Sequence, residues 1–335
     1  MDWGGRDRII VSFTLGLQKR TLSKMNNATN APAAGSTYRL VDFGEGRKLE
    51  SFGGRLFDRP SPAAEGGRKQ RPEQWRDADS VFDEGRRAWH HRTKFSGPCE
   101  VDCGGFRMPI SPTPFGHVGL FPEQAQNWRW LMETSPKGIS QANGQPSGQP
   151  DLRPSGLNLF GYTGAGSIAM ATTGMKVAHV DAAKQNVSAA RAAALVNGLG
   201  THPIRYLVDD AAKFVAREAR RGNQYHTIIM DPPAYGHGPK GKSWRLERDL
   251  WPLIDASLSI LTQESFRLLI TGHSRQVGTM DVLNYLDSRV AKLLGLKSND
   301  FAANVRSGRL TLIDAVNRKL DAGFFVRCSY NLIDA

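Results

Sequence analysis

The residues best suited to chemistry begin with a glycine-rich turn that follows an apolar run. Residues 157–160 read Leu-Asn-Leu-Phe, and residues 161–166 continue Gly-Tyr-Thr-Gly-Ala-Gly. Because glycine has no side chain, a backbone built from it can approach a ligand closely where a strand turns into a helix. Purely structural turns are built in the same way, so the glycines alone indicate a ligand only weakly.

Acidic residues follow the next two apolar runs. Asp181 comes twenty residues after Gly161, directly after the run 177–180, where its carboxylate can accept hydrogen bonds from both hydroxyls of a ribose. Asp210 follows the run 204–208 and suits the exocyclic amine of an adenine. Either aspartate taken singly is explained equally well as a helix N-cap. Together with the glycine turn, the acid after the second run predicts a cleft that binds a nucleoside.

The order of the glycines distinguishes between kinds of nucleoside. A dinucleotide fingerprint reads G-x-G-x-x-G and seats a pyrophosphate on a helix N-terminus, whereas residues 161–166 read G-x-x-G-x-G. This difference disfavours an NAD-linked oxidoreductase.

A pair of prolines follows the fourth apolar run, in the segment Asp231-Pro232-Pro233-Ala234-Tyr235. Two consecutive prolines cannot continue a central strand, so the chain must leave the sheet at this point. The Asp231 carboxylate and the Pro232 carbonyl can accept hydrogen bonds from an amino group and aim its lone pair, while Tyr235 can stack on a base. A core aromatic is the alternative interpretation of Tyr235.

These segments belong to a part of the chain in which apolar runs alternate with helical stretches. The helical stretches are rich in alanine, lysine and arginine, as in 182–199 and 211–221, and they separate the runs 157–160, 177–180, 204–208, 227–230 and 268–271. Such alternation predicts a parallel sheet with helices on both faces. A helix over 279–294 and strands over 310–313 and 324–330 are expected to follow. Residues 155–335 are therefore predicted to form a doubly wound, Rossmann-like α/β domain.

The first half of the chain has a different texture. Residues 1–35 are small and polar and are predicted to be a disordered arm. Over residues 36–134, short apolar stretches alternate with glycine and proline, which predicts a small β-rich domain. Within it, the charged stretch 61–92 is expected to be an exposed loop. Glycines and prolines over 135–154 predict a linker.

Composition narrows the function classes. The 335 residues carry a net charge of +12, which makes a nucleic acid a natural partner, although a solvated basic surface explains the same charge. No run approaches the roughly 18 apolar residues of a membrane helix, so neither an integral membrane protein nor a membrane partner is expected. The three cysteines indicate neither a disulfide framework nor a metal site. With no signal segment at the N-terminus, the expected location is cytoplasmic.

Taken in order, the four segments resemble the motifs of class I S-adenosylmethionine-dependent methyltransferases. That family has a glycine turn after its first strand, acids after its second and third, and a D/N-P-P-x-aromatic segment after its fourth. The resemblance covers about residues 38–335 and is nearest to the bacterial large-subunit (23S) ribosomal-RNA methyltransferases. This nearer match rests on residues 158–164 (Asn-Leu-Phe-Gly-Tyr-Thr-Gly), on residues 231–233 and on residues 117–124 (His-Val-Gly-Leu-Phe-Pro-Glu-Gln).

The resemblance implies S-adenosylmethionine as the cofactor and assigns roles to two groups of residues. The cofactor would be held by the glycine turn and the strand-end acids, with two residues of the 117–124 segment nearby: Phe160, Gly161, Tyr162, Thr163, Gly164, Asp181, Asp210, Phe121 and Gln124. The methyl donor and acceptor would meet at Asp231, Pro232, Pro233 and Tyr235.

Methylation of cytosine C5 is disfavoured. That carbon becomes nucleophilic only after a thiolate adds to the ring, and relatives with this activity carry a cysteine after strand five or beside the prolines. Here residues 271–274 read Thr-Gly-His-Ser, the proline segment has no cysteine, and Cys328 lies in a late strand. His273 is interpreted as a substrate contact or base, or else as a polar neighbour of the site.

A basic loop follows the proline segment and contains one tryptophan. Cations suit phosphates and an indole suits a splayed base, so Lys240, Lys242, Trp244 and Arg245 are expected to contact RNA together with His273. A solvated lid is the alternative.

The sequence therefore predicts an S-adenosylmethionine-dependent methyltransferase, monomeric or homodimeric, that methylates a base of ribosomal RNA. One alternative is a methyltransferase for a small molecule or a protein. Another is an RNA-binding module without catalytic activity. The fold alone does not decide between these substrates.

Overall fold

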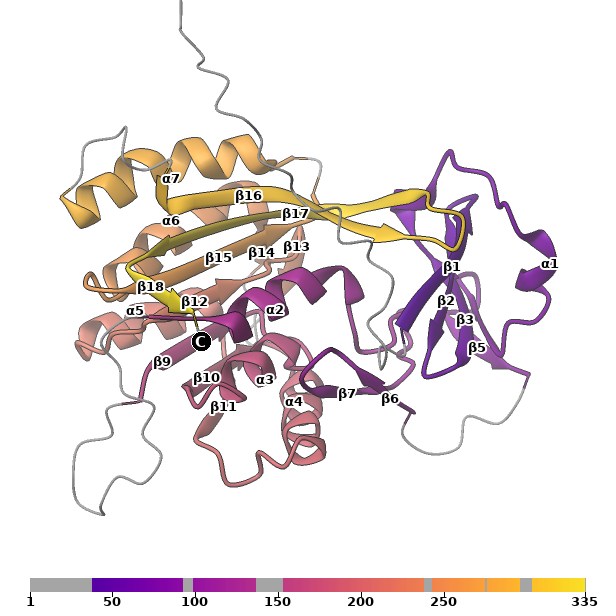
Figure 1. The fold of residues 1–335 in the computed structure, drawn as a ribbon, viewed down its shortest axis with the longest axis horizontal. Coiled ribbons are helices and arrows are strands. Elements are labelled where there is room, and N and C mark those ends of the chain that lie inside the picture. Colours follow the sequence, from indigo (N-terminus) through magenta and orange to yellow (C-terminus); the bar gives the residue numbers. More distant parts are fainter. Residues whose placement is uncertain are drawn as a thin grey trace, which may run out of the picture. The chain divides into compact units, whose positions relative to one another are not determined.

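A computed structural model of the chain describes residues 38–92, 99–136, 153–237, 243–274, 276–295 and 303–334 (Figure 1). The predicted N-terminal arm and residues 137–152 of the predicted linker lie outside the described residues. Among the described residues, no helix is both long enough and apolar enough to cross a membrane.

A seven-stranded sheet forms the centre of the fold, in the order β11-β10-β9-β12-β15-β17-β16. Five neighbouring strands from β11 to β15 are parallel, and β17 runs antiparallel to both β15 and β16. The strands are β9 (Ser155–Leu159), β10 (Lys176–Asp181), β11 (Ile204–Val208), β12 (Thr227–Met230), β15 (Phe266–Gly272), β16 (Val305–Ile313) and β17 (Lys319–Tyr330). Because β9 pairs with β10 on one side and β12 on the other, the order of the strands reverses at β9, and ligands of such sheets bind at this point.

Helices cover both faces of this sheet, which confirms the predicted α/β class. One face carries α2 (Ala125–Glu133), α3 (Ala165–Ala171) and α4 (Lys184–Val196), and the other carries α5 (Ala211–Arg220), α6 (Leu246–Ser259) and α7 (Thr279–Leu294). Alternate residues of a strand point to opposite faces. Leu157 and Leu159 therefore pack against the α5–α7 face, while Asn158 between them points to the α2–α3 side.

A second, five-stranded sheet is formed by the N-terminal part, in the order β1-β2-β3-β4-β5. Its pairs are antiparallel except for β3 with β4. The strands are β1 (Tyr38–Gly44), β2 (Arg47–Phe52), β3 (Arg55–Pro60), β4 (Ser80–Asp83) and β5 (Ala88–His91), with the short helices η1 (Pro62–Ala64) and α1 (Pro72–Trp75) between β3 and β4. The predicted β-rich character of this part is confirmed.

The expectation of an exposed loop over 61–92 is wrong. This stretch supplies two strands, and the side chains of Trp75 and Phe82 are buried. The Trp75 indole donates a 2.7 Å hydrogen bond to the buried Asp42 carboxylate, which is far away in sequence. Apolar residues scattered among many charged ones carry no visible period, so these contacts could not be read from the sequence.

The described residues also form three small antiparallel pairs, and one long hairpin contacts both sheets. The pairs are β6 (Cys99–Asp102) with β7 (Arg107–Ile110), β8 (Thr134–Pro136) with β18 (Leu332–Asp334), and β13 (Tyr235–His237) with β14 (Ser243–Arg245). The β16–β17 hairpin reaches β1 (Figure 1). Leu312 and Leu320 of the hairpin pack with Leu40 and Phe43 of β1. The proposed division into an N-terminal and a C-terminal domain stays a prediction.

Candidate functional site

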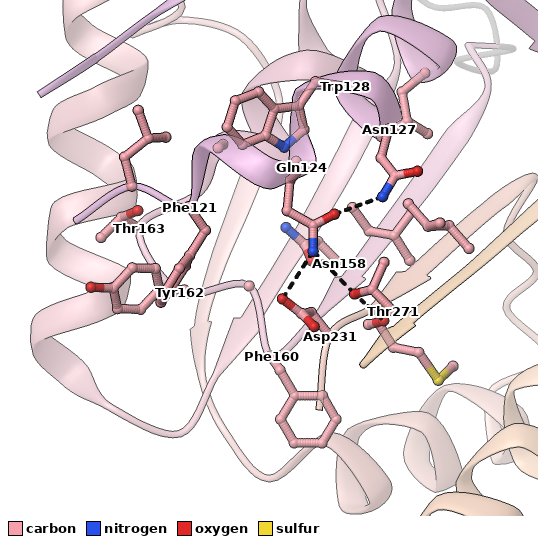
Figure 2. Close-up of a pocket in the computed structure, with 18 residues that line it drawn as sticks. Phe121, Gln124, Asn127, Trp128, Asn158, Phe160, Tyr162, Thr163, Asp231 and Thr271 are labelled. Atoms are coloured by element: carbon pink, nitrogen blue, oxygen red, sulfur yellow. Dashed lines mark hydrogen bonds between the residues drawn. The ribbon is translucent and has the colours of Figure 1, made fainter. Parts of the chain in front are cut away.

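A cavity lies at the carboxyl ends of β9, β12 and β15, bordered by η2 (Pro122–Gln124) and the first turns of α2 (Figure 2). The glycine turn supplies one wall, with Phe160, Gly161, Tyr162 and Thr163. A second wall includes Phe121, Gln124, Asn127 and Trp128, and its Phe121 ring lies 5.2 Å from the Tyr162 ring. The strand ends supply Asn158, Asp231 and Thr271. The cavity therefore occupies the position where the sheet topology predicts a ligand.

The glycine turn is tightly constrained. Phe160 and Tyr162, on either side of Gly161, have φ of 56° and 49°, which few non-glycine residues adopt. A Cβ on Gly161 would lie 2.5 Å from the His179 ring, and one on Gly164, which has φ of 94°, would lie 2.8 Å from the Ala190 side chain. Backbone strain of this kind is common at functional sites. Gly161 is required here because the protein's own His179 occupies the space beside it.

The buried His179 ring supports this turn from below. Its Nδ1 lies 3.0 Å from Ser167 Oγ, which also accepts a 2.9 Å hydrogen bond from Asn158 Nδ2. Burial lowers the pKa of His179 to about 4, so the imidazole is neutral at pH 7. A neutral polar network of this kind holds the turn against β9 and β10 without burying a charge.

The two acids that follow β10 and β11 behave differently. Asp181 accepts hydrogen bonds from the Tyr162 backbone N–H at 2.8 Å and from the Ala183 N–H at 2.9 Å, so it ties the glycine turn to the end of β10. Asp210 is the N-cap of α5 and accepts from the Lys213 N–H at 2.9 Å. The helix-cap alternative thus describes Asp210, and its contact with an adenine stays a prediction.

A chain of amide side chains leads to Asp231 (Figure 2). Gln124 Nε2 donates to Asp231 Oδ2 at 3.2 Å and to Thr271 Oγ1 at 3.3 Å. Gln124 Oε1 accepts from Asn127 Nδ2 at 2.7 Å, and Asn127 Oδ1 accepts from Arg327 of β17 at 2.8 and 3.0 Å. Gln124 is the residue before α2 and Asn127 lies three residues later, so both face the same side.

The proline segment leaves the sheet as predicted and continues into β13. Pro232 is buried, whereas Tyr235 is 63% exposed. The Trp244 indole N–H donates to the Pro233 carbonyl at 2.7 Å, and its ring lies 4.9 Å from the Phe160 ring. Trp244 therefore holds the proline segment and the glycine turn together, with its N–H group already engaged.

Four buried polar atoms near the glycine turn have no hydrogen-bond partner among the described residues. They are Nη2 of Arg59, Oε2 of Glu123, the hydroxyl of Tyr162 and Nε2 of His179. Burial raises the pKa of both Glu123 and Tyr162, and the Arg59 charge opposes that rise in each. Orphaned polar atoms beside a ligand cavity are a reason to expect a polar ligand.

No family model matches this chain. Among solved structures, the SAM-dependent methyltransferase from Agrobacterium tumefaciens is 31% identical and superimposes with a TM-score of 0.71 over 87% of this chain and 90% of that one. The chain belongs to the S-adenosylmethionine-dependent methyltransferases. The structure of SMU.776 complexed with SAH has the same fold, with 16% identity and a TM-score of 0.62 over 90% of this methyltransferase and 76% of that chain.

Curated relatives match shorter stretches. Ribosomal RNA large subunit methyltransferase I of Klebsiella pneumoniae subsp. pneumoniae is 30% identical over 80 residues, which are 24% of this methyltransferase and 20% of that protein. Ribosomal RNA large subunit methyltransferase K/L of Shewanella frigidimarina is 25% identical over 128 residues, or 38% and 17% of the two chains. The matched stretches thus span a fifth or less of these relatives.

The structure brings most of the predicted cofactor residues of this methyltransferase to one cavity. Its lining includes Phe121, Gln124, Phe160, Gly161, Tyr162, Thr163 and, from the catalytic group, Asp231. Gly164, Asp181 and Asp210 lie outside the lining. Of the residues predicted to contact RNA, Arg245 and His273 are exposed, Trp244 is half-buried, and Lys240 and Lys242 lie outside the described residues.

Sequence reasoning missed four polar contributors to the site: Asn127, Asn158, Thr271 and Arg327. Asn158 carried a signal, because a lone amide in a run of buried apolar residues requires a partner. The sequence around Arg327 gave no signal of its role, because its partner Asn127 lies 200 residues earlier in the sequence. In the described parts of the chain, no group of three or more histidine, cysteine or acidic residues could hold a metal.

Proposed function

We propose that this protein binds S-adenosylmethionine in the cavity and transfers its methyl group to an amino nitrogen of a ribosomal-RNA base. The observation that carries the proposal is the position of Asp231 in the cavity wall, at the end of β12 and next to β9, the strand that leads into the glycine turn. Gln124 binds Oδ2 of this carboxylate, and none of the described residues donates to Oδ1. An incoming amino group can therefore donate to that oxygen.

The residues present fit the cofactor. Gly161 and Gly164 allow the tight turn, because a Cβ on either would meet His179 or Ala190. Asp181 Oδ1 accepts from the Ala183 N–H and from Asn186 Nδ2, while Oδ2 accepts from the Tyr162 N–H and retains a lone pair for a ribose hydroxyl. The other candidates for this role are Phe121, Gln124, Phe160, Tyr162, Thr163 and Asp210. The orphaned polar atoms of Arg59, Glu123 and Tyr162 suit the charged amino-acid end of S-adenosylmethionine, which would give them partners.

S-adenosylmethionine supplies an activated methyl group, so the protein mainly aligns donor and acceptor. The nitrogen lone pair would form the bond to the methyl carbon as the carbon–sulfur bond breaks, and the nitrogen would then give its proton to water. Asp231 and the Pro232 carbonyl would aim the lone pair. The Pro233 carbonyl already binds Trp244, and Tyr235 is exposed enough to stack on a base.

Cysteine chemistry finds no support in the site. None of the three cysteines lines the cavity, and burial raises the pKa of Cys328 to about 12. A thiol of that kind is not a nucleophile at neutral pH. This disfavours C5 of cytosine as the acceptor and favours an atom that is nucleophilic on its own.

Two observations support RNA as the substrate. The net charge is +12, and relatives that match part of this chain are named as ribosomal-RNA large-subunit methyltransferases. Trp244, Arg245, His273, Lys240 and Lys242 remain the proposed contacts. A ribosomal substrate would place the protein in the cytoplasm.

Calorimetry and mass spectrometry test the two parts of this proposal separately. Titration of the full chain with S-adenosylmethionine and with SAH is expected to give saturable binding of both, and an absence of heat with either would overturn the cofactor assignment. Mass spectrometry of ribosomal RNA from cells with and without the gene is expected to reveal one missing methyl mark. Identical spectra with intact cofactor binding would point instead to a small molecule or a protein as the acceptor.

A further inference from the structure

The direction of the Gln124 amide is determined by a residue of β17. Arg327 approaches Asn127 Oδ1 with Nε at 3.0 Å and Nη2 at 2.8 Å. A guanidinium can only donate hydrogen bonds, so the oxygen of the Asn127 amide must face it. The nitrogen of that amide then faces Gln124, which must accept with Oε1. Gln124 is left with its N–H groups toward Asp231 and Thr271 (Figure 2).

Arg327 is itself held firmly. Its guanidinium lies 4.5 Å from the Phe325 ring and 5.0 Å from the Trp130 ring, and Nη2 also donates to the Gln126 carbonyl at 2.7 Å. Burial lowers the pKa of Arg327 to about 10, so it remains protonated at neutral pH. The Asn127 and Gln124 amides, which follow Arg327 in this series of hydrogen bonds, therefore each have a single orientation that satisfies their hydrogen bonds.

The orientation of the Gln124 amide decides which kind of atom can approach the Asp231 carboxylate. One carboxylate oxygen is bound by Gln124, and the other receives no hydrogen bond from the described residues. A carboxylate oxygen only accepts, so the atom that approaches it must carry a hydrogen. If the Gln124 amide were inverted, its oxygen would face the carboxylate and repel it from this position.

We propose that Arg327 and Asn127 are positioning residues that fix the N–H group of Gln124 on Asp231 and thereby select a methyl acceptor that donates a hydrogen bond. The acceptor class is an exocyclic amino nitrogen, which carries the hydrogen that such a contact requires. This rests on the proposed function, because it assumes that Asp231 meets the acceptor.

Asn127→Asp is the sharpest test, because it changes one atom type without changing the size of the side chain. The aspartate keeps an oxygen on Arg327 but has no N–H for Gln124 Oε1, so the Gln124 amide inverts. We expect kcat to fall at least tenfold while the Kd of S-adenosylmethionine and the melting temperature change little. Asn284→Asp, which makes the same chemical change on the exposed side of α7, is the matched control and should retain full turnover.

Arg327 variants provide a graded comparison. Lysine can still donate to Asn127 Oδ1, whereas methionine cannot, so Arg327→Lys should retain most of the turnover that Arg327→Met loses. Equal losses in the two variants would indicate that Arg327 only packs α2 against the sheet, which would overturn the proposal.

A spectroscopic readout makes the test independent of activity. In protein labelled with 15N-glutamine, the side-chain resonance of Gln124 is assigned by its absence in Gln124→Met. Asn127→Asp should shift that resonance strongly and Asn284→Asp should not. Turnover is measured with tritiated S-adenosylmethionine on ribosomal RNA from cells lacking the gene. If the wild-type chain transfers no methyl group, the proposed function fails while the resonance still reports the amide. An unmoved resonance, wild-type kcat in Asn127→Asp, or an equal loss of cofactor binding overturns the positioning role.

Discussion

The two walls of the cavity are held by groups at very different distances along the chain. The glycine wall, residues 160–164, is fixed by Asp181 and by the His179–Ser167 pair, through contacts that span 19 and 12 residues. The glutamine wall, residues 121–128, is fixed by contacts of Gln124 that span 107 and 147 residues and by an Asn127–Arg327 contact that spans 200. One wall is built locally, and the other depends on the completed sheet.

This difference predicts how each wall responds to change. The glycine wall is constrained by space and backbone conformation, so a single added carbon should disturb it. The glutamine wall is constrained by the direction of hydrogen bonds, so a change of one atom type should disturb it. The same difference decides which wall the sequence could reveal.

The largest effect is expected from Gly161→Ala. The added Cβ would lie 2.5 Å from the His179 ring, and overpacking at such a site costs about 3 kcal/mol. If the displaced turn is the cofactor wall, the Kd of S-adenosylmethionine in calorimetry should rise roughly a hundredfold. Gly85→Ala in the β4–β5 hairpin, where an added Cβ has room, should leave it unchanged. If Gly161→Ala binds S-adenosylmethionine with the wild-type Kd, the glycine wall accommodates the added carbon and this prediction is wrong.

The α/β class and the glycine wall could be predicted because their signals are local. Each parallel strand is a short apolar run, and the helix expected over 279–294 is found as α7. The turn and Asp181 lie within one crossover unit, so their proximity follows from the order of the elements. The strands expected over 310–313 and 324–330 were found, but as parts of a longer hairpin whose far end packs on β1.

The glutamine wall could be predicted only in part. The resemblance pointed to Phe121 and Gln124, yet their relation to Asp231 depends on how α2 docks on the sheet. Arg267 sets that docking from β15, because it donates to the Leu131 carbonyl at the end of α2 and to Thr227 Oγ1. Burial lowers the pKa of Arg267 to about 9. Buried arginines paired with backbone carbonyls leave no pattern in a sequence.

An effect of similar size is expected from pH, because the glycine wall rests on a neutral histidine. Burial lowers the pKa of His179 from its ordinary 6.5 to about 4, so between these values the unfolded chain binds a proton that the folded one does not. Stability contributed by this site is full above pH 6.5 and falls as pH drops, by about 3 kcal/mol at pH 4. Urea unfolding across this range should show a shallower decline for His179→Asn. Parallel declines would mean that His179 is protonated in the fold.

Asp181→Ala should weaken the glycine wall without adding bulk. It removes the acceptor of the Tyr162 N–H and the proposed ribose contact, so binding of S-adenosylmethionine should weaken by about 1.5 to 3 kcal/mol. Asp181→Asn keeps one acceptor oxygen, so its affinity for S-adenosylmethionine should lie between those of Asp181→Ala and the wild type in the same calorimetry. Unchanged affinity in the alanine variant would remove Asp181 from the cofactor site.

Trp244→Phe tests the segment where the two walls meet the acceptor. An aromatic ring on Phe160 is retained, while the hydrogen bond to the Pro233 carbonyl, worth about 1 kcal/mol, is lost together with part of the indole volume. Turnover should fall a few-fold with cofactor affinity unchanged. Trp251→Phe deletes a comparable N–H bond to the Glu247 carbonyl on α6 and should leave turnover intact. Equal turnover in the two variants would make Trp244 a simple packing residue.

Cys328→Ser should have the smallest effect on catalysis. Cys328 is fully buried in β17 between β15 and β16, where it pairs with Leu268 and Val305, and burial raises the pKa of its thiol to about 12. A serine hydroxyl in that position costs about 1 to 3 kcal/mol of stability, which urea unfolding measures. Methylation per folded molecule should stay the same, because both walls and Asp231 keep all their contacts. Lost turnover in a normally folded Cys328→Ser protein would restore a thiolate mechanism, and with it a ring carbon as the acceptor.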